Sequence, residues 1–216
     1  MKETYFTAQD ILAQASRMRD LAQSRRGGQP LEPARSALLV LDLQNYFLDT
    51  ASHAFIPSAA AILPAIQALI QAYRRRSLPV VFTRHANTPQ DAAMMARWWR
   101  DLLAIESPLS QLSPLLEIGG SPVLLKSQYD AFFQTGLEEI LHKSDVRQLL
   151  VCGVMAHLCC ETTARSAFMR GFEVFFLVDG TASYNRDFHQ ASLLNLAHGF
   201  ATLLLTGEAL AALEAG

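Results

Sequence analysis

Short apolar runs alternate with longer amphipathic runs from Ala37 onward. Six of the short runs are rich in Val, Leu and Phe, and they lack the every-second-residue alternation of a strand with one face in solvent. A strand that is buried on both faces has this pattern. The sequence therefore predicts six strands, over residues 37–42, 79–83, 122–125, 148–153, 173–178 and 201–204.

The stretches between these runs have the apolar spacing of amphipathic helices. The predicted helices span residues 58–75, 91–103, 136–144, 158–170 and 187–198. Strands that alternate with helices predict an α/β fold. We expect a doubly wound, mostly parallel six-stranded sheet with right-handed crossovers and helices on both faces.

The first 35 residues precede this pattern. Residues 7–23 have helical spacing, and the run Arg-Arg-Gly-Gly-Gln-Pro at 25–30 ends it. We therefore divide the chain into an N-terminal helix and linker at 1–35 and an α/β domain at 36–216. The helix is expected to pack on a neighbour or on a partner subunit.

Composition limits the class of protein. Half of the 216 residues are apolar, which is enough for one sizeable core. Eighteen basic and twenty acidic residues give a net charge of −2, so we expect no nucleic-acid partner and no membrane-surface partner. No run of 18 uninterrupted apolar residues is present, and the N-terminus has no signal-peptide pattern.

The three cysteines, Cys152, Cys159 and Cys160, lie within nine residues of one another. Their odd number and close spacing do not fit a disulfide framework. They indicate reduced thiols in a cytoplasmic protein. High apolar content and the N-terminal helix favour a homodimer or a larger homo-oligomer.

Chemically active side chains follow the predicted strands. Asp42 ends the first strand, Lys126 ends the third, and Cys159 lies in the turn and helix after the fourth. In an open parallel sheet, ligands bind beyond the carboxyl ends of the strands, so these three side chains are expected to converge there.

A thiol attacks as its thiolate, and it therefore needs a lowered pKa or a neighbouring base. Lys126 and a helix N-terminus would favour the thiolate, and Asp42 could take the thiol proton. The backbone N–H groups of Met155 and Cys159 could bind an oxyanion. An aspartate that caps a loop, a solvated lysine and a packed cysteine are equally consistent with the spacing, which leaves both interpretations open.

Three ordered motifs resemble the isochorismatase-like cysteine hydrolases. They are Leu-Asp-Leu-Gln-Asn-Tyr-Phe at 41–47, Leu-Lys-Ser-Gln-Tyr-Asp-Ala-Phe at 125–132, and the run at 153–165; the resemblance covers about 36–206. It implies a six-stranded parallel α/β sandwich and a catalytic triad of Asp42, Lys126 and Cys159. It also implies a cis peptide bond between Val154 and Met155.

Two branches of this family use different chemistry. The run at 159–165 is similar to the amidase pattern, whereas the run at 155–160 is similar to the isochorismatase pattern with Cys159 in place of a glycine. Amide hydrolysis needs a nucleophile, but vinyl-ether cleavage needs only a proton donor, here Asp42. We therefore predict a cysteine hydrolase that cleaves a C–N bond of a small amide, ureide or carbamoyl substrate. The alternative is an isochorismatase-type vinyl-ether hydrolase, and a third possibility is a non-catalytic protein that binds a small ligand.

Polar and aromatic side chains near the strand ends are candidates for a pocket around a small-molecule substrate. They are Gln44, Phe47, Arg84, His85, Tyr129 and His157. Arg84 could pair with a substrate carboxylate, and Trp98 and Trp99 could form a lid or a subunit contact. Some amidases of the family hold a metal with one Asp and two His, but Asp49 and His53 have no second histidine before His85. We therefore expect no metal and no organic cofactor.

Overall fold

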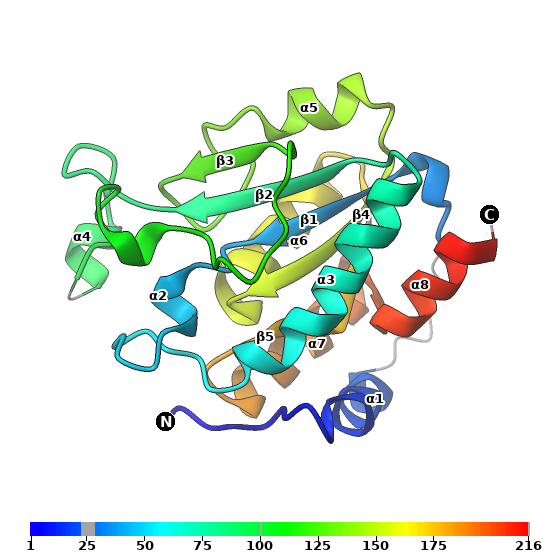
Figure 1. Ribbon diagram of the computed structural model, residues 1–216, viewed down its shortest axis with the longest axis horizontal. Helices are drawn as coiled ribbons and strands as arrows, with labels where there is room; N and C mark the ends of the chain where they lie inside the picture. Colours follow the sequence, from blue (N-terminus) through cyan, green and yellow to red (C-terminus); the bar gives the residue numbers. More distant parts are fainter. Residues whose placement is uncertain (23–28, 100, 216) are drawn as a thin grey trace.

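The computed structural model describes residues 1–22, 29–99 and 101–215. Its six strands form one all-parallel sheet with the order β3-β2-β1-β4-β5-β6, which confirms the predicted fold (Figure 1). The strands are β1 (Ser36–Leu41), β2 (Val80–His85), β3 (Val123–Lys126), β4 (Gln148–Val154), β5 (Glu173–Ala182) and β6 (Thr202–Leu204).

Helices pack on both sides of the sheet. Helices α3 and α8 contact β5 on one side, while α6 and α7 contact it on the other (Figure 1). The helices are α1 (Ile11–Ala22), α2 (Asn45–Leu48), α3 (Ala59–Arg75), α4 (Met95–Trp98), α5 (Leu137–Lys143), α6 (Glu161–Met169), α7 (Arg186–Gly199) and α8 (Thr206–Ala215). Short 3-10 turns cover Pro33–Arg35 and Pro108–Ser110, and a π-helical turn covers Ala156–Cys160. None of the described helices is both long and apolar enough to cross a membrane.

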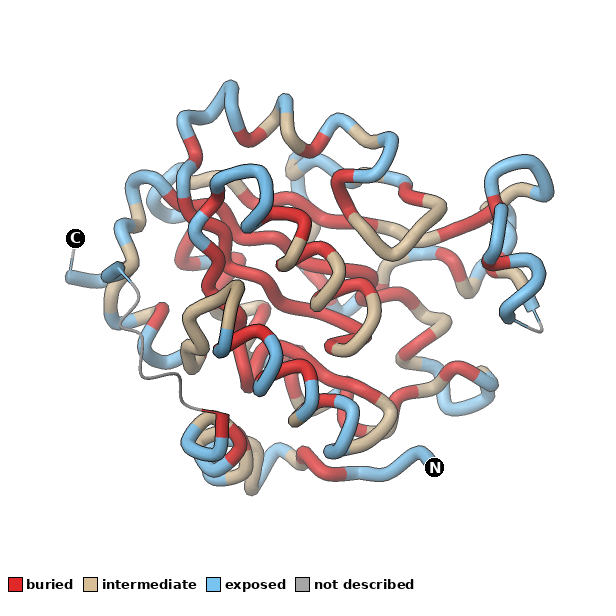
Figure 2. The backbone as a smooth tube through the Cα atoms, turned by 180° about the vertical axis from the view of Figure 1, so that it is seen from behind, coloured by how far each residue is buried: buried red, intermediate tan, exposed pale blue. Residues whose placement is uncertain are grey.

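The central strands β1 and β4 are buried along their whole length, as their uninterrupted apolar runs predict (Figure 2). The edge strand β3 differs, because Val123 and Leu125 are 43% and 46% exposed. Its apolar run therefore does not mark a strand that is buried on both faces. The order of the strands reverses between β1 and β4, and in such sheets this switch point is where a crevice opens at the carboxyl ends.

The segment predicted as a helix over 91–103 is mostly a loop. Among its described residues only those of α4 are α-helical, and the N–H of Asn87 donates to the carbonyl of Leu103 at 2.7 Å, which closes the segment into a loop. The loop buries apolar residues as a helix would, namely Ala92, Met95 and Leu103. The periodicity alone does not distinguish the two conformations.

Two further differences concern the ends of the chain. Helix α1 packs on α7 and β5 of its own chain, and most of the predicted linker at 25–30 lies outside the described residues. Helix α8 was not predicted, although its Ala- and Leu-rich composition is typical of a helix.

Candidate active site

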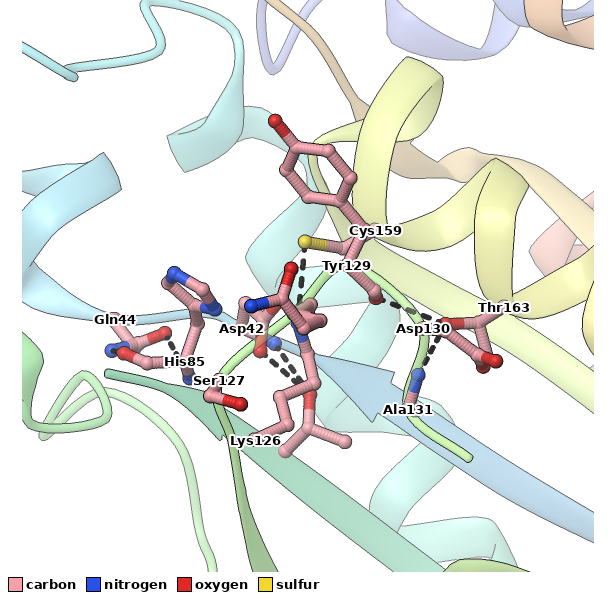
Figure 3. Close-up of polar contacts among 12 residues, drawn as sticks. Asp42, Gln44, His85, Lys126, Ser127, Tyr129, Asp130, Ala131, Cys159 and Thr163 are labelled. Carbon is pink, nitrogen blue, oxygen red and sulfur yellow. Dashed lines mark hydrogen bonds and ion pairs between the residues drawn. The ribbon is translucent and has the colours of Figure 1, made fainter. Parts of the chain in front are cut away.

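Asp42, Lys126 and Cys159 meet at the carboxyl ends of β1, β3 and β4 (Figure 3). The Lys126 Nζ lies 2.8 Å from the Asp42 Oδ2, and the side chains of this ion pair are fully buried. The same Nζ lies 3.3 Å from the Cys159 Sγ. The convergence expected from the strand ends is therefore present in the structure.

Asp42 is held by its own strand end and by the next strand. Its backbone has a φ of +52°, and the Thr83 hydroxyl donates to its Oδ1 at 2.7 Å. The other carboxylate oxygen of Asp42, Oδ2, has the Lys126 Nζ as its ion-pair partner. Lys126 also donates to the carbonyl of Gln128 at 2.9 Å. One oxygen of the carboxylate thus pairs with the amine, while the other is anchored by Thr83.

Cys159 stands on a sharp turn after β4. Gly153, with a φ of +115°, comes so close to β1 that a Cβ there would lie 2.0 Å from the carbonyl oxygen of Leu41. The peptide bond between Val154 and Met155 is cis, as the family resemblance implies. The π-helical turn that follows carries Cys159, and its first N–H groups belong to a helix start that lacks intrahelical acceptors.

The electrostatic environment of Cys159 differs from the expectation of an acidified thiol. Burial raises the pKa of Cys159 to about 12; Lys126 lowers it, and the neighbouring Asp42 raises it through its charge and a hydrogen bond. Burial lowers the pKa of Lys126, but Asp42 and Cys159 more than offset this effect and keep the amine charged. The thiol is therefore protonated at neutral pH, and its attack depends on a base.

The other two cysteines have no comparable partners. Cys152 lies inside β4, and burial raises its pKa. Cys160 is fully buried, and burial followed by the charges of Cys159 and Asp42 raises its pKa well above the ordinary value. Both residues therefore fit packing roles.

A cavity of about 160 Å³ opens beside Cys159. Aromatic side chains make up much of its wall, and the predicted pocket residues Phe47, His85 and Tyr129 are among them. Its lining residues are Tyr46, Phe47, His53, Ala54, His85, Met95, Trp99, Asp101, Leu103, Tyr129, Met155, Leu158, Cys159 and Tyr184.

Two predicted pocket residues have structural roles instead. The Gln44 amide is fully used by the backbone: it donates to the carbonyls of His85 and Ser110, and it accepts from the N–H of His85 (Figure 3). The Arg84 guanidinium donates to the carbonyls of Ile105 and Ser110 and to the hydroxyl of Ser110. Pairing of Arg84 with a substrate carboxylate stays a prediction, and the guanidinium would have to leave some of these acceptors to make it.

His157 also lies outside the cavity wall. Its Nδ1 is 2.5 Å from the Ser183 Oγ, and its ring stacks on Phe188 with 4.4 Å between centroids. His85 does line the cavity, and burial followed by the charge of Lys126 lowers its pKa to about 4. It is therefore neutral at physiological pH.

Sequence reasoning missed Tyr46, His53, Asp101 and Tyr184 on the cavity wall. Motif position could have indicated Tyr46, which follows Gln44 and Asn45 in the first motif, but the other three belong to loops. Of the tryptophan pair, Trp99 lines the cavity and donates through Nε1 to the Tyr129 hydroxyl at 2.7 Å. Trp98 points to solvent and is 74% exposed.

Comparison with known proteins identifies the family. The model of the isochorismatase domain matches residues 36–208. The chain belongs to the isochorismatase family. It is 41% identical to nicotinamidase 3 of Arabidopsis thaliana over 78% of this chain and 84% of that protein. It is 31% identical to the isochorismatase of Bacillus subtilis, over 90% of this chain but only 63% of that protein.

Solved structures confirm the fold of this family member. A cysteine hydrolase from Pseudomonas syringae pv. phaseolicola superposes with a TM-score of 0.81 and 26% identity, over 89% of this chain and 99% of that chain. A pyrazinamidase of Pyrococcus horikoshii in complex with zinc superposes with a TM-score of 0.71 at 22% identity, over 79% of this chain and 99% of that chain, which shows a shared fold.

A metal ion in such a site needs several His, Cys, Asp or Glu side chains that converge. No group of three His, Cys, Asp or Glu side chains suited to a metal ion occurs within 1–22, 29–99 and 101–215. Of the two histidines at the cavity, His53 has its Nε2 3.0 Å from the Tyr46 hydroxyl and 4.0 Å from the Asp101 Oδ2, whereas His85 is held by its backbone to Gln44. The described side chains therefore do not fit a metal, and no catalytic step below uses one.

Proposed function

We propose that this protein is a cysteine hydrolase that cleaves a C–N bond of a small amide, ureide or carbamoyl substrate through a covalent acyl-enzyme. The observation that carries the proposal is the buried contact between Cys159, Lys126 and Asp42 at the cavity. A nucleophile, a base and a cation within one hydrogen-bonded cluster are the minimum for acyl transfer.

In the first half-reaction, the Cys159 sulfur attacks the carbonyl carbon of the substrate while Asp42 takes the thiol proton. The carbonyl oxygen gains a negative charge, and we assign its binding to the N–H groups of Met155 and Cys159. Asp42 then gives its proton to the nitrogen. The C–N bond breaks, ammonia or an amine leaves, and the acyl group remains on Cys159 as a thioester.

In the second half-reaction, Asp42 takes a proton from water, and the resulting hydroxide adds to the thioester carbon. The C–S bond breaks, and the sulfur recovers its proton from Asp42. Lys126 remains a cation throughout, and it stabilises whichever of Asp42 and Cys159 carries the negative charge.

The cavity favours a small, flat substrate. Its volume of about 160 Å³ is below the usual range for drug-sized ligands, and Phe47, Trp99 and Tyr129 offer ring surfaces. The similarity to nicotinamidase 3 supports an aromatic amide, and nicotinamide is therefore the first substrate to test.

The second candidate is a vinyl-ether hydrolase acting on isochorismate, with Asp42 as the proton donor. The 31% identity to the Bacillus subtilis isochorismatase favours it. Two observations count against it. Cys159 occupies space beside Asp42 that this reaction does not need, and Arg84 is not free to bind a carboxylate of isochorismate.

The deciding experiment compares ammonia release from nicotinamide, a ureide and an N-carbamoyl amino acid with pyruvate release from isochorismate. Cys159→Ala is expected to lower C–N hydrolysis at least about 1,000-fold, and mass spectrometry of wild type should detect an acyl adduct on Cys159. Cys159→Ala with full activity on isochorismate would instead establish the vinyl-ether reaction, with Asp42→Asn as the inactive variant. Binding without turnover of any substrate would indicate a ligand-binding protein.

The cytoplasmic setting and the homodimer or larger homo-oligomer are also proposals from the sequence. Light scattering on the purified chain measures the second directly.

A further inference from the structure

The first six residues, Met1–Phe6, form an N-terminal arm that lies against residues 183–186 after β5 and against the start of α3 (Figure 1). The Glu3 N–H donates to the Tyr184 carbonyl at 2.9 Å, and the Glu3 carboxylate accepts from the N–H of Arg186 at 2.6 Å. On the other side, the N–H groups of Tyr5 and Phe6 donate to the Ser58 hydroxyl. The arm is thus bonded on two sides by parts of the α/β domain.

A chain of hydrogen bonds with one direction runs through the buried phenol of Tyr5. The Thr181 hydroxyl donates to the Leu177 carbonyl at 2.8 Å, so it can only accept from the Nε2 of His189, 3.0 Å away. The Nδ1 of His189 is then an acceptor, and the Tyr5 hydroxyl donates to it at 3.0 Å. The Tyr5 oxygen in turn accepts from the N–H of Ser183 at 2.7 Å.

Ser183 connects this series of hydrogen bonds to two parts of the active site, the turn that carries Cys159 and the wall of the cavity. Its hydroxyl contacts the Nδ1 of His157 at 2.5 Å, and His157 lies on the π-helical turn two residues before Cys159. The next residue, Tyr184, is part of the cavity wall. Lys2 of the arm also bonds to the carbonyl of His53, and its Nζ lies 4.6 Å from the centre of the Tyr184 ring.

We propose that Tyr5 is a positioning residue of the active site, which holds Ser183 and thereby fixes the Tyr184 wall of the cavity and the His157 side of the Cys159 turn. Tyr5 does not touch the triad, so it acts through these neighbours. The arm then supports the substrate site from outside the cavity wall. The effect on substrate binding rests on the proposed function.

The test compares Tyr5→Phe with Tyr73→Phe in the full-length chain. Tyr73 is an equally buried tyrosine whose hydroxyl contacts the Ser36 hydroxyl at 2.8 Å, at the other end of the sheet. Each variant loses one phenolic hydroxyl group and keeps the aromatic ring. Tyr5→Phe is expected to raise KM for the hydrolysed amide about tenfold, the usual size of one lost hydrogen bond, and to change kcat less than about threefold. Tyr73→Phe should keep KM within about twofold of wild type.

A second readout does not depend on turnover. The rate at which iodoacetamide alkylates Cys159, located by peptide mass spectrometry, reports access through the same cavity. Tyr5→Phe is expected to change this rate at least about threefold, and Tyr73→Phe is expected to leave it unchanged. If wild type hydrolyses none of the C–N substrates but the alkylation rates differ in this way, the proposed function fails and the positioning role holds.

Ser183→Ala provides a further test if Tyr5→Phe does not fold. It leaves Tyr5 in place and removes only the contact to His157. It is expected to change the alkylation rate of Cys159 at least about threefold from that of wild type. Equal KM and alkylation rates in folded Tyr5→Phe and Tyr73→Phe would overturn the proposal, as would a folded Ser183→Ala with wild-type values.

Discussion

Replacing Lys126 by methionine is expected to destabilise the fold as well as the chemistry. The Lys126 Nζ and the Asp42 Oδ2 are 2.8 Å apart, and neither side chain is exposed. At an effective dielectric constant of about 20, the attraction across this distance is about 6 kcal/mol. Part of it offsets the cost of removing both charges from water. Removing the cation alone leaves the carboxylate of Asp42 buried without a counter-ion, and such changes cost about 3–5 kcal/mol.

A double-mutant cycle measured by urea unfolding tests this reasoning. Lys126→Met should lose about 3–5 kcal/mol of unfolding free energy, which is a large share of the ~5–15 kcal/mol of a typical domain. Adding Asp42→Asn removes the unpaired charge, so the double variant should recover at least about 2 kcal/mol. The control is Lys143→Met, which breaks an exposed ion pair to Glu139 and should leave stability unchanged within error. A double variant no more stable than Lys126→Met would refute the argument.

Three other predictions concern single residues. Gly153→Ala should prevent stable folding, because its Cβ would clash with the Leu41 backbone at a φ of +115°, whereas Gly207→Ala in α8 has free space and should keep or raise the melting temperature. Burial raises the pKa of Cys159 to about 12, so the difference in thiolate ultraviolet absorbance between wild type and Cys159→Ser should not rise up to about pH 9. A rise with its midpoint below pH 8 would contradict the buried environment. Burial lowers the pKa of His189 from 6.5 to about 3, so as the pH falls the unfolded chain takes up this proton before the folded chain does. His189 should therefore make stability fall as pH drops below 6.5, by up to about 1.4 kcal/mol per pH unit in addition to the loss from His85, whose pKa is also lowered. A His189→Gln variant that loses stability as steeply as wild type would show that His189 is not responsible.

The sequence predicted the sheet well because each central strand is an uninterrupted apolar run. Such runs need burial on both faces, and a parallel sheet covered by helices supplies it. The same logic located the site, because Asp42 and Lys126 come directly at the ends of their strands. The edge strand β3 shows the limit: its apolar run is as continuous as the others, although Val123 and Leu125 are partly in solvent. Whether a strand lies at the edge or in the centre of a sheet depends on which strands it pairs with, and the local sequence pattern does not contain that information.

The cavity wall was harder to predict than the triad, because loops form most of it. Arg84 follows an apolar strand and is a reasonable ligand for a carboxylate, yet its guanidinium is used by carbonyls of Ile105 and Ser110 more than 20 residues away. Tyr184 and His53 meet at the cavity only because the N-terminal arm and two loops fold together. Contacts of this kind depend on tertiary packing.

The high pKa of Cys159 and its proposed role as a nucleophile agree once the three charges are counted together. Losing the thiol proton to solvent would create a new anion in a buried site, and burial opposes it. Transfer of the same proton to Asp42 creates no new charge. The cluster then holds one cation, on Lys126, and one anion, which moves from the carboxylate to the sulfur. Lys126 contacts both positions, at 2.8 Å and 3.3 Å, so the anion keeps its partner before and after the transfer. A thiolate therefore has to exist only while a substrate is attacked, which explains how a buried thiol that is protonated at rest can be the nucleophile.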